Sequence, residues 1–201
     1  MKGIRFSVPV SRYSVVLFIA LFLAMPVTSA YAQNSSAWTG NVNIFAGYKN
    51  LDEDDWDPLD KQTELGIGVD FKQDGWPVSA TVGYLRSSDD DSEMGIDIEG
   101  KTSELYVGVR KIWDTSPQLR PFVGGGLALV SAEMEAAALG IKVSDDDSGI
   151  GFWLSGGAYL TVSGSFNIGA ELRYSKASVT LFNTDVEAGG VHYGLLLGYH
   201  W

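Results

Sequence analysis

Six charged residues of both signs stand at alternate positions within apolar segments of the sequence. They are Glu64, Asp70, Glu104, Arg110, Glu171 and Arg173. Because side chains alternate across a strand, each belongs to the polar face of its segment. Charges enclosed on such a face must pair with one another, since removing one partner of a buried pair costs about 3–5 kcal/mol. The pattern therefore predicts a satisfied polar network inside the fold, with a narrow or gated polar pathway as the functional alternative.

Three acidic stretches, DEDDWD, DDDSE and SDDDS, lie between the alternating segments. Clustered carboxylates are the hard oxygen ligands that Ca²⁺ prefers, although none of the three has the spacing of a calcium-binding loop. We expect a solvated acidic surface, with weak Ca²⁺ or Mg²⁺ binding that bridges it to lipopolysaccharide phosphates as the alternative. In the first stretch, Asp52, Asp54 and Asp55 surround Trp56. We expect Trp56 to be exposed, where it can anchor a partner or dip into a lipid head-group layer.

Nucleophilic catalysis would need a serine within hydrogen-bond reach of a base. The stretch RYSK offers Ser175, and the only histidines are His192 and His200. Neither histidine is obviously placed beside that serine, and both fall on the polar face of the last segment, where they are expected to fill space. The glycine-rich stretches do not lie between a strand and a helix, so they are not phosphate-binding loops. We assign no catalytic, cofactor-binding or metal-ligating residue.

The elements that must position these residues are strands, because the chain after Gln33 shows period two and no convincing helical period. The expected strands fall within residues 38–49, 62–72, 78–85, 102–110, 120–130, 151–162, 167–176 and 189–201. The links after the second, fourth and sixth strands are short and rich in turn residues, whereas the other four are longer. The sequence therefore predicts an all-β, eight-stranded antiparallel up-and-down barrel with every long link at one end.

Composition and aromatic spacing decide which face of this barrel is apolar. Only 19% of the residues are charged, and the polar faces are mostly glycine, serine, threonine and asparagine, which is too little charge to solvate an exterior. Aromatic residues gather at both ends of the strands: Trp38, Phe71, Trp76, Trp113, Phe166, Tyr199 and Trp201 at the short links, and Tyr48, Tyr84, Tyr174, Phe182 and Tyr193 at the long ones. Two aromatic bands around an aliphatic middle indicate a transmembrane barrel whose apolar face meets lipid.

The amino-terminal segment has the features of an export signal. Basic residues precede an apolar run of about 12 residues, which is short of the roughly 20 that a spanning helix needs. Ala30 and Ala32 then form a small-x-small cleavage pattern. We expect residues 1–32 to be a cleaved signal peptide and 33–201 to be the barrel domain. Cleavage would take the formal charge from −11 to −14, because three basic residues and no acidic residue are lost. Such a charge excludes a nucleic-acid partner.

The export signal, the alternating strands, the short and long links and the closing YGLLLGYHW together resemble the small outer-membrane β-barrel families. These are the outer membrane protein A transmembrane domain and the outer membrane protein X and W types. In those families an alternating apolar carboxyl end is the signal read by the barrel-assembly machinery, and the matching residues here are Tyr193, Leu195, Leu197, Tyr199 and Trp201. The last residue is tryptophan where phenylalanine is usual. The resemblance implies a Gram-negative outer membrane location, with long loops extracellular and both termini periplasmic.

The sequence thus favours a non-enzymatic, porin-like protein of the cell envelope. We expect a structural and surface-interaction role, with passage of small or hydrophobic solutes as the outer membrane protein W type would imply. The first alternative is an acidic-loop protein that binds divalent cations, lipopolysaccharide, or a host or phage partner. The second is a lipid A-modifying enzyme. Tyr174 argues against it, because such deacylases have their base histidine at this position. No cofactor is expected.

Overall fold

The computed structural model describes residues 38–93, 96–116, 118–138 and 141–201, so the expected signal peptide and its cleavage site after Ala32 lie outside the described residues. The elements in chain order are β1 (Trp38–Asn50), α2 (Glu53–Trp56), β2 (Lys61–Gln73), β3 (Ser79–Glu93), β4 (Ile96–Ile112), β5 (Leu119–Ala138), β6 (Ile141–Val162), β7 (Phe166–Lys176), β8 (Ser178–Leu181), β9 (Thr184–Glu187) and β10 (Gly190–His200). Within these ranges, no helix is long and apolar enough to cross a membrane.

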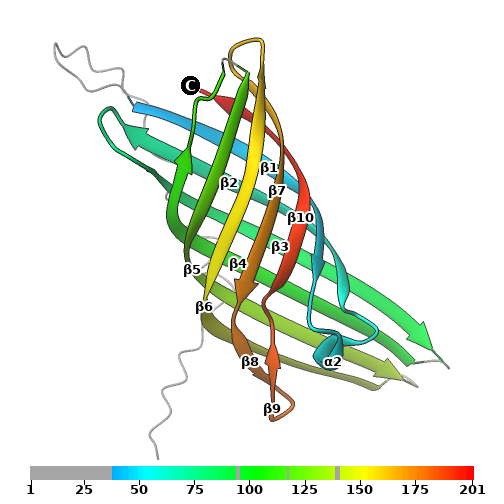
Figure 1. The fold of residues 1–201 in the computed structure, drawn as a ribbon. Coiled ribbons are helices and arrows are strands. Elements are labelled where there is room, and N and C mark those ends of the chain that lie inside the picture. The colour runs from blue at the N-terminus through cyan, green and yellow to red at the C-terminus, as the bar shows by residue number, and fades with distance from the viewer. Residues whose placement is uncertain (1–37, 94–95, 117, 139–140) are drawn as a thin grey trace, which may run out of the picture. The chain divides into compact units, whose positions relative to one another are not determined.

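Eight of the described strands close into one antiparallel barrel in the order β1-β10-β7-β6-β5-β4-β3-β2 (Figure 1). Each strand pairs with its neighbour in sequence, and β10 closes the sheet by pairing with β1 from Asn41↔His200 to Asn50↔Val191. The ladder is extended by two backbone hydrogen bonds of 3.1 Å that join Gly40 and Trp201. The predicted all-β, eight-stranded up-and-down barrel is confirmed, and its closure leaves no open edge within the wall.

The second and third long links are not loops, which corrects the expectation from sequence. β3 and β4 pair as far as Glu93↔Ile96, and β5 and β6 pair as far as Ala138↔Ile141. β6 has 22 residues, twice the 11 of β7. The acidic stretches DDDSE and SDDDS therefore belong to strands that run past the rest of the barrel. Consecutive aspartates suggest a loop, but here they alternate between the two faces of a strand.

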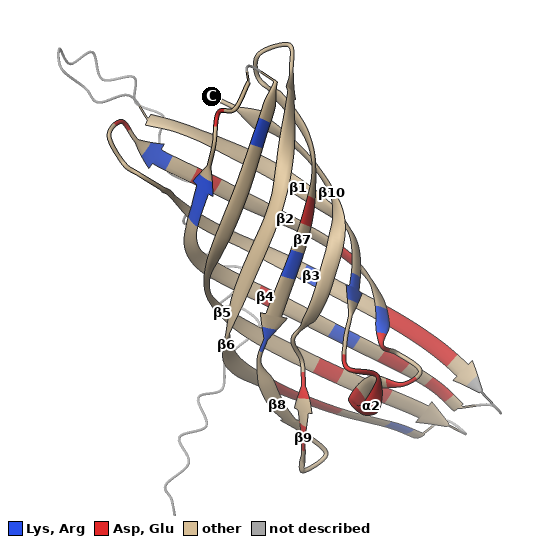
Figure 2. Cartoon of the chain, in the orientation of Figure 1, with Lys and Arg blue, Asp and Glu red and all other residues tan. Residues whose placement is uncertain are grey.

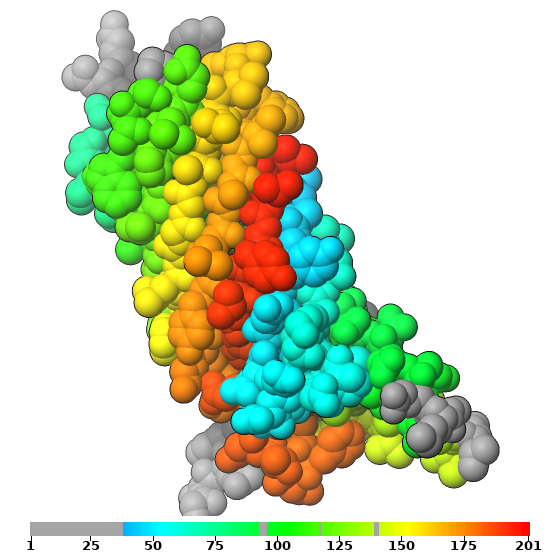
Figure 3. Space-filling model, turned by 45° about the vertical axis from the view of Figure 1, so that its right-hand side comes forward, coloured from blue at the N-terminus to red at the C-terminus, as the bar shows by residue number. Residues whose placement is uncertain are grey.

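The first and fourth long links fold over the same end of the barrel, which we call the long-hairpin end. The first contains α2, whose N-cap is Asp52, and the fourth forms the β8–β9 hairpin. In Figure 3 the cyan segment around α2 and the orange β8–β9 hairpin lie together at that end. We call residues 51–60 and 178–187 the lid. The opposite end, with three short turns, is the short-turn end.

The outer face of the barrel is apolar along its whole middle. Its exposed side chains include Ile44, Leu65, Ile67, Leu105, Val107, Leu127, Leu154, Leu172, Leu195 and Leu197. The aromatic bands expected at the two ends are largely present. At the short-turn end the ring of Trp38 lies 5.7 Å from that of Trp76 between centroids, and at the other end Tyr48 lies 5.8 Å from Tyr193. Phe182 is the exception, because it occupies the turn of the β8–β9 hairpin, away from the rim.

Glycines on the inner face make room for large aromatic side chains. Tyr106 lies across Gly68 and Gly83, and its hydroxyl occupies the space that a Cβ would take at either position. A Cβ added at Gly68 would lie 2.5 Å from the Tyr106 hydroxyl oxygen but 3.8 Å from the ring carbon that bears it. The conflict at Gly68 is therefore with a single atom.

This geometry predicts that Gly68→Ala destabilises the barrel by about 1–3 kcal/mol, the usual cost of overpacking. In a Tyr106→Phe background the same change should cost little, because the conflicting hydroxyl is gone. Urea unfolding in lipid vesicles, followed by tryptophan fluorescence for the four proteins of the cycle, measures the coupling. Equal losses in both backgrounds would contradict this account of the glycine.

Candidate functional site

Two buried arginines organise the centre of the barrel interior. Arg110 on β4 pairs with Asp70 of β2 at 3.3 Å and with Glu171 of β7 at 3.1 Å. Arg173 on β7 pairs with Glu104 of β4 at 2.9 Å and with the same Glu171 at 3.3 Å. Glu171 thus joins the two arginines, and the network links strands from opposite sides of the wall.

Aromatic rings line the faces of both guanidinium groups. The Arg110 guanidinium carbon lies 4.3 Å from the centre of the Phe122 ring. That of Arg173 lies 3.8 Å from the centre of Tyr106 and 4.5 Å from that of Trp153. Cation–π contacts of this kind compensate for lost hydration while the edges of each guanidinium bond to carboxylates. The arginines, carboxylates and rings together fill the interior.

The sixth predicted member of the network, Glu64, has a different partner. His192 on β10 bonds through its Nδ1 to both Glu64 carboxylate oxygens at 3.0 and 2.9 Å, and its Nε2 lies 2.9 Å from the Ser175 hydroxyl. His192 therefore lies beside Ser175, a placement that was not obvious from the sequence. The prediction that His192 faces the lumen is correct. Its closeness to Ser175 could not be predicted in the same way, because it depends on the register between β7 and β10.

The Ser175–His192–Glu64 arrangement has the connectivity of a catalytic triad without the space that catalysis needs. Ser175 is only 1% exposed and His192 is fully buried. The small cavity that His192 borders, together with Arg110 and Arg173, has a volume of about 20 Å³. That volume holds about one water molecule. No acyl group fits there, so the three side chains act as a hydrogen-bonded part of the interior.

A layer of polar side chains separates this centre from the lid. Lys49 of β1 donates to the Thr102 hydroxyl at 2.9 Å and to the Ala188 carbonyl at 2.8 Å. Ser87 donates to the Gln62 side chain at 2.9 Å and lies 2.6 Å from the Thr102 hydroxyl. The sequence predicts Lys49 on the polar face but not as a member of the network. Its reach across to the segment after β9 could not be foreseen without the closed fold.

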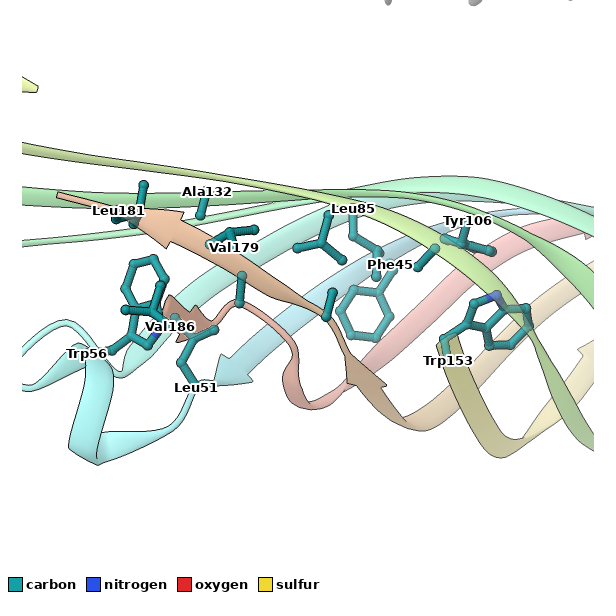
Figure 4. Packing of buried hydrophobic residues seen from close by; sticks show 14 of the residues in the cluster. Phe45, Leu51, Trp56, Leu85, Tyr106, Ala132, Trp153, Val179, Leu181 and Val186 are labelled. Atoms are coloured by element: carbon teal, nitrogen blue, oxygen red, sulfur yellow. The ribbon is translucent and has the colours of Figure 1, made fainter. Parts of the chain in front are cut away.

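The lid has its own apolar core, with Trp56 at its centre (Figure 4). Trp56 is 1% exposed, and it packs in one cluster with Leu51, Val179, Leu181 and Val186. Its indole N–H donates to the Glu187 carbonyl at 2.8 Å. The expectation of an exposed Trp56 is therefore wrong: Asp52 and Asp54 beside it are exposed, while the ring joins the two halves of the lid.

Two of the three aspartates singled out in the first link have structural contacts. The Asp52 carboxylate accepts the backbone N–H of Asp54 at 3.1 Å, and the Asp55 carboxylate accepts that of Glu187 at 2.8 Å. Asp54 itself is exposed. Among the described residues, no three His, Cys, Asp or Glu side chains are grouped so as to hold a metal ion. Cation binding by Asp52, Asp54 and Asp55 stays a prediction.

The sequence matches a family that explains both the apolar outer face and the closed wall. Residues 17–201 match the model of the outer membrane protein β-barrel domain. The chain belongs to this family. It is therefore an integral outer-membrane protein, and the apolar outer face of the barrel is its surface toward lipid.

Solved outer-membrane barrels have a similar fold at low sequence identity. Ail, the attachment invasion locus protein of Yersinia pestis, in complex with the heparin analogue sucrose octasulfate, has a TM-score of 0.58 at 14% identity, with 82% of this chain and 99% of that chain covered. Neisserial surface protein A has a TM-score of 0.52 at 15% identity, with 84% of this chain and 97% of that chain covered. A major outer membrane protein of Thermus thermophilus has a TM-score of 0.54 at 11% identity, with 82% of this chain and 100% of that chain covered. Comparison with curated proteins gives no match.

The ion network predicts a large difference between buried and exposed cations of this outer-membrane barrel. Arg110→Met leaves Asp70 and Glu171 buried without that partner, so we expect a loss of about 3–5 kcal/mol in unfolding free energy. Lys61→Met removes a cation that is 74% exposed and pairs with Asp60 at 3.5 Å, and should cost about 0–1 kcal/mol. Urea unfolding in lipid compares the two. Similar losses would show that the interior network does not hold the barrel together.

Proposed function

We propose that this outer-membrane barrel is a closed, non-enzymatic protein that strengthens the envelope and presents a structured acidic surface. The filled interior is the observation that carries the proposal. Three successive layers obstruct the axis: the lid core around Trp56, the polar layer around Lys49, and the arginine network around Glu171. Axial passage of small or hydrophobic solutes would require all three to move.

The proposed orientation puts the long-hairpin end outside the cell, and the short-turn end with both chain termini of the barrel domain in the periplasm. Short turns on the periplasmic side and longer connections outside are the general arrangement of bacterial outer-membrane barrels. The acidic residues on α2 and on the outer parts of β3, β4 and β5 (Figure 2) then face both the medium and the lipopolysaccharide layer. Lipid and lipopolysaccharide are thus the proposed constant partners.

The charge of this surface sets the kind of ligand that it accepts. The Ail structure was determined with a sulfated heparin analogue, whereas the formal charge of this chain is −11. Sulfated polyanions would be repelled by the acidic strands. We therefore propose that the protein partners of this acidic surface are cationic.

The non-enzymatic part of the proposal is supported by the burial of Ser175. A lipid-modifying serine must meet an acyl chain, yet Ser175 points into the filled interior, and its neighbour Tyr174 is the residue exposed on the outer face. The described residues around Ser175 leave no space beside its hydroxyl for an ester carbonyl and its leaving group. The hydrogen bond to His192 is accordingly assigned to stability.

Purified barrel in planar lipid bilayers tests the closed state. We expect no conductance steps for the wild-type protein, because the axis is obstructed at three levels. A variant with Trp56→Ala, Lys49→Ala and Arg173→Ala, which removes one side chain from each layer, should produce brief, small openings. Trp38→Ala on the outer face should stay silent. Steady conductance by the wild type would overturn the closed-barrel proposal.

Assembly provides a separate test, because we propose that the alternating residues Tyr193, Leu195, Leu197, Tyr199 and Trp201 are recognised by the barrel-assembly machinery. Trp38 is a matched control: it is 52% exposed at the short-turn end, and Trp201 is 46% exposed at the same end. Trp201→Ser should reduce the amount of heat-modifiable barrel in the outer membrane several-fold more than Trp38→Ser. Equal reductions would mean that both residues act only as interfacial aromatics.

A further inference from the structure

Past the rim of the barrel, four strands continue as a sheet of their own. β2 pairs with β3 only as far as Thr63↔Ser88, whereas β3 to β6 remain paired beyond that point. We call residues 89–93, 96–101, 133–138 and 141–147 the distal sheet. Figure 3 shows its green and yellow-green strands extending past the cyan segment around α2.

The face of the distal sheet that continues the lumen-facing side is apolar. The register sets Ile96, Ala138 and Ile141 in one row across three strands. Ile98, Ala136 and Val143 form the next row on the same face. Ile141 is 69% exposed and Val143 is 52% exposed. We call these six residues the apolar face.

The opposite face of the distal sheet is acidic. Asp90, Glu99 and Glu135 stand directly opposite one another in a single row across β3, β4 and β5. Like charges in opposed positions destabilise a sheet. Water and nearby cations reduce this repulsion, so we expect this face to be solvated. The lysines of this face, Lys101 and Lys142, are already paired with Glu99 and Glu135.

An antiparallel sheet with one apolar face normally packs that face against a second layer. The lid supplies such a layer for the part nearest the barrel: Leu59 lies over Gly100, and Met134 packs against the cluster that contains Trp56. The apolar face begins one row beyond Gly100 and Met134, on the same side of the same strands. It is therefore a continuation of an interface that the protein already uses.

Charge decides which kind of layer completes it. Asp89 and Asp91 border the apolar face on β3, and Asp145, which accepts the backbone N–H of Phe182 at 2.6 Å, borders it on β6. A second copy of this chain would bring the same negative charge and be repelled. A segment with apolar residues on one side and lysine or arginine on its flanks would match both: its apolar side fits the apolar face, and its basic flanks fit the bordering aspartates.

We propose that the apolar face binds a basic, amphipathic polypeptide segment of a partner protein, which forms the second layer beside the lid. This rests on the proposed surface-presenting function and names its partner class. The apolar residues supply specificity by burial, and the acidic borders accelerate and strengthen association at low salt.

The test uses the full barrel in lipid nanodiscs and three fluorescein-labelled peptides of equal length, with empty nanodiscs as the reference. One peptide alternates leucine with lysine, one alternates serine with lysine, and one alternates leucine with glutamate. We expect the leucine–lysine peptide to bind at least tenfold more tightly than either of the others, by fluorescence anisotropy. Equal binding of the serine–lysine peptide would overturn the proposal, since attraction to the acidic face alone would then suffice.

Variants place the binding on the apolar face. Ile141→Ser with Val143→Ser should weaken the leucine–lysine peptide at least tenfold. Ile150→Ser is the matched control, because Ile150 is 79% exposed on the same strand but on its other face. Asp89→Asn with Asp91→Asn should weaken binding and flatten its salt dependence. Heat-modifiable mobility checks that each variant is folded.

Two results would overturn the proposal without touching the closed barrel. One is unchanged binding by the Ile141→Ser, Val143→Ser variant. The other is a dimer of the wild-type protein in nanodisc or detergent sizing that this variant loses, since a second copy would then be the occupant. Failure of the proposed function would instead be seen as conductance in planar bilayers, so the two failures are distinguishable.

Discussion

The constraint on which this structure depends is that every backbone group in the hydrocarbon must find its partner within the protein. No water is available there, so a sheet that crosses a membrane has to close on itself. Closure here is the ladder between β1 and β10, extended by the backbone bonds between Gly40 and Trp201. The two segments farthest apart in the barrel sequence therefore become neighbours, and the register of that last ladder fixes which face each side chain of β10 occupies.

Closure with eight strands also fixes the width of the interior, and side chains nearly fill a barrel of that size. This chain fills the narrow interior in two ways. Large rings and arginines occupy some levels, and glycines such as Gly68 and Gly83 yield the space that Tyr106 needs. The charges at the centre are acceptable only because Arg110 and Arg173 each contact two carboxylates and at least one aromatic ring. The interior is thus a polar core in which size and charge had to be matched together.

Sequence patterns predicted the barrel and the faces of its strands well, because side-chain alternation is a local property. The placement of Arg110 and Glu171 on the inner side of the wall follows from period two alone. Their contact with each other, and that of Ser175 with His192, depends on ladder register and interior width, which no single segment encodes. Trp56 shows a second limit: its acidic neighbours suggested exposure, but its burial depends on the β8–β9 hairpin, far along the chain.

The length of the strands was the other feature that local patterns concealed, and the reason is a reversal of polarity along each strand. In β4 the inner residues change from Glu104 and Thr102 to Ile98, while the outer residues change from Leu105 to Glu99. The backbone stays extended and keeps its register through this change; only the surroundings of the two faces are exchanged. Within the bilayer the outer face meets lipid and must be apolar, whereas beyond the rim it meets water and is acidic. On β3 the first outer charge is Arg86, opposite Ser103, and the next row carries Lys101 and Glu133. These two rows therefore mark the edge of the hydrocarbon. A segment that looks like an acidic loop in sequence is the same strand in a different solvent.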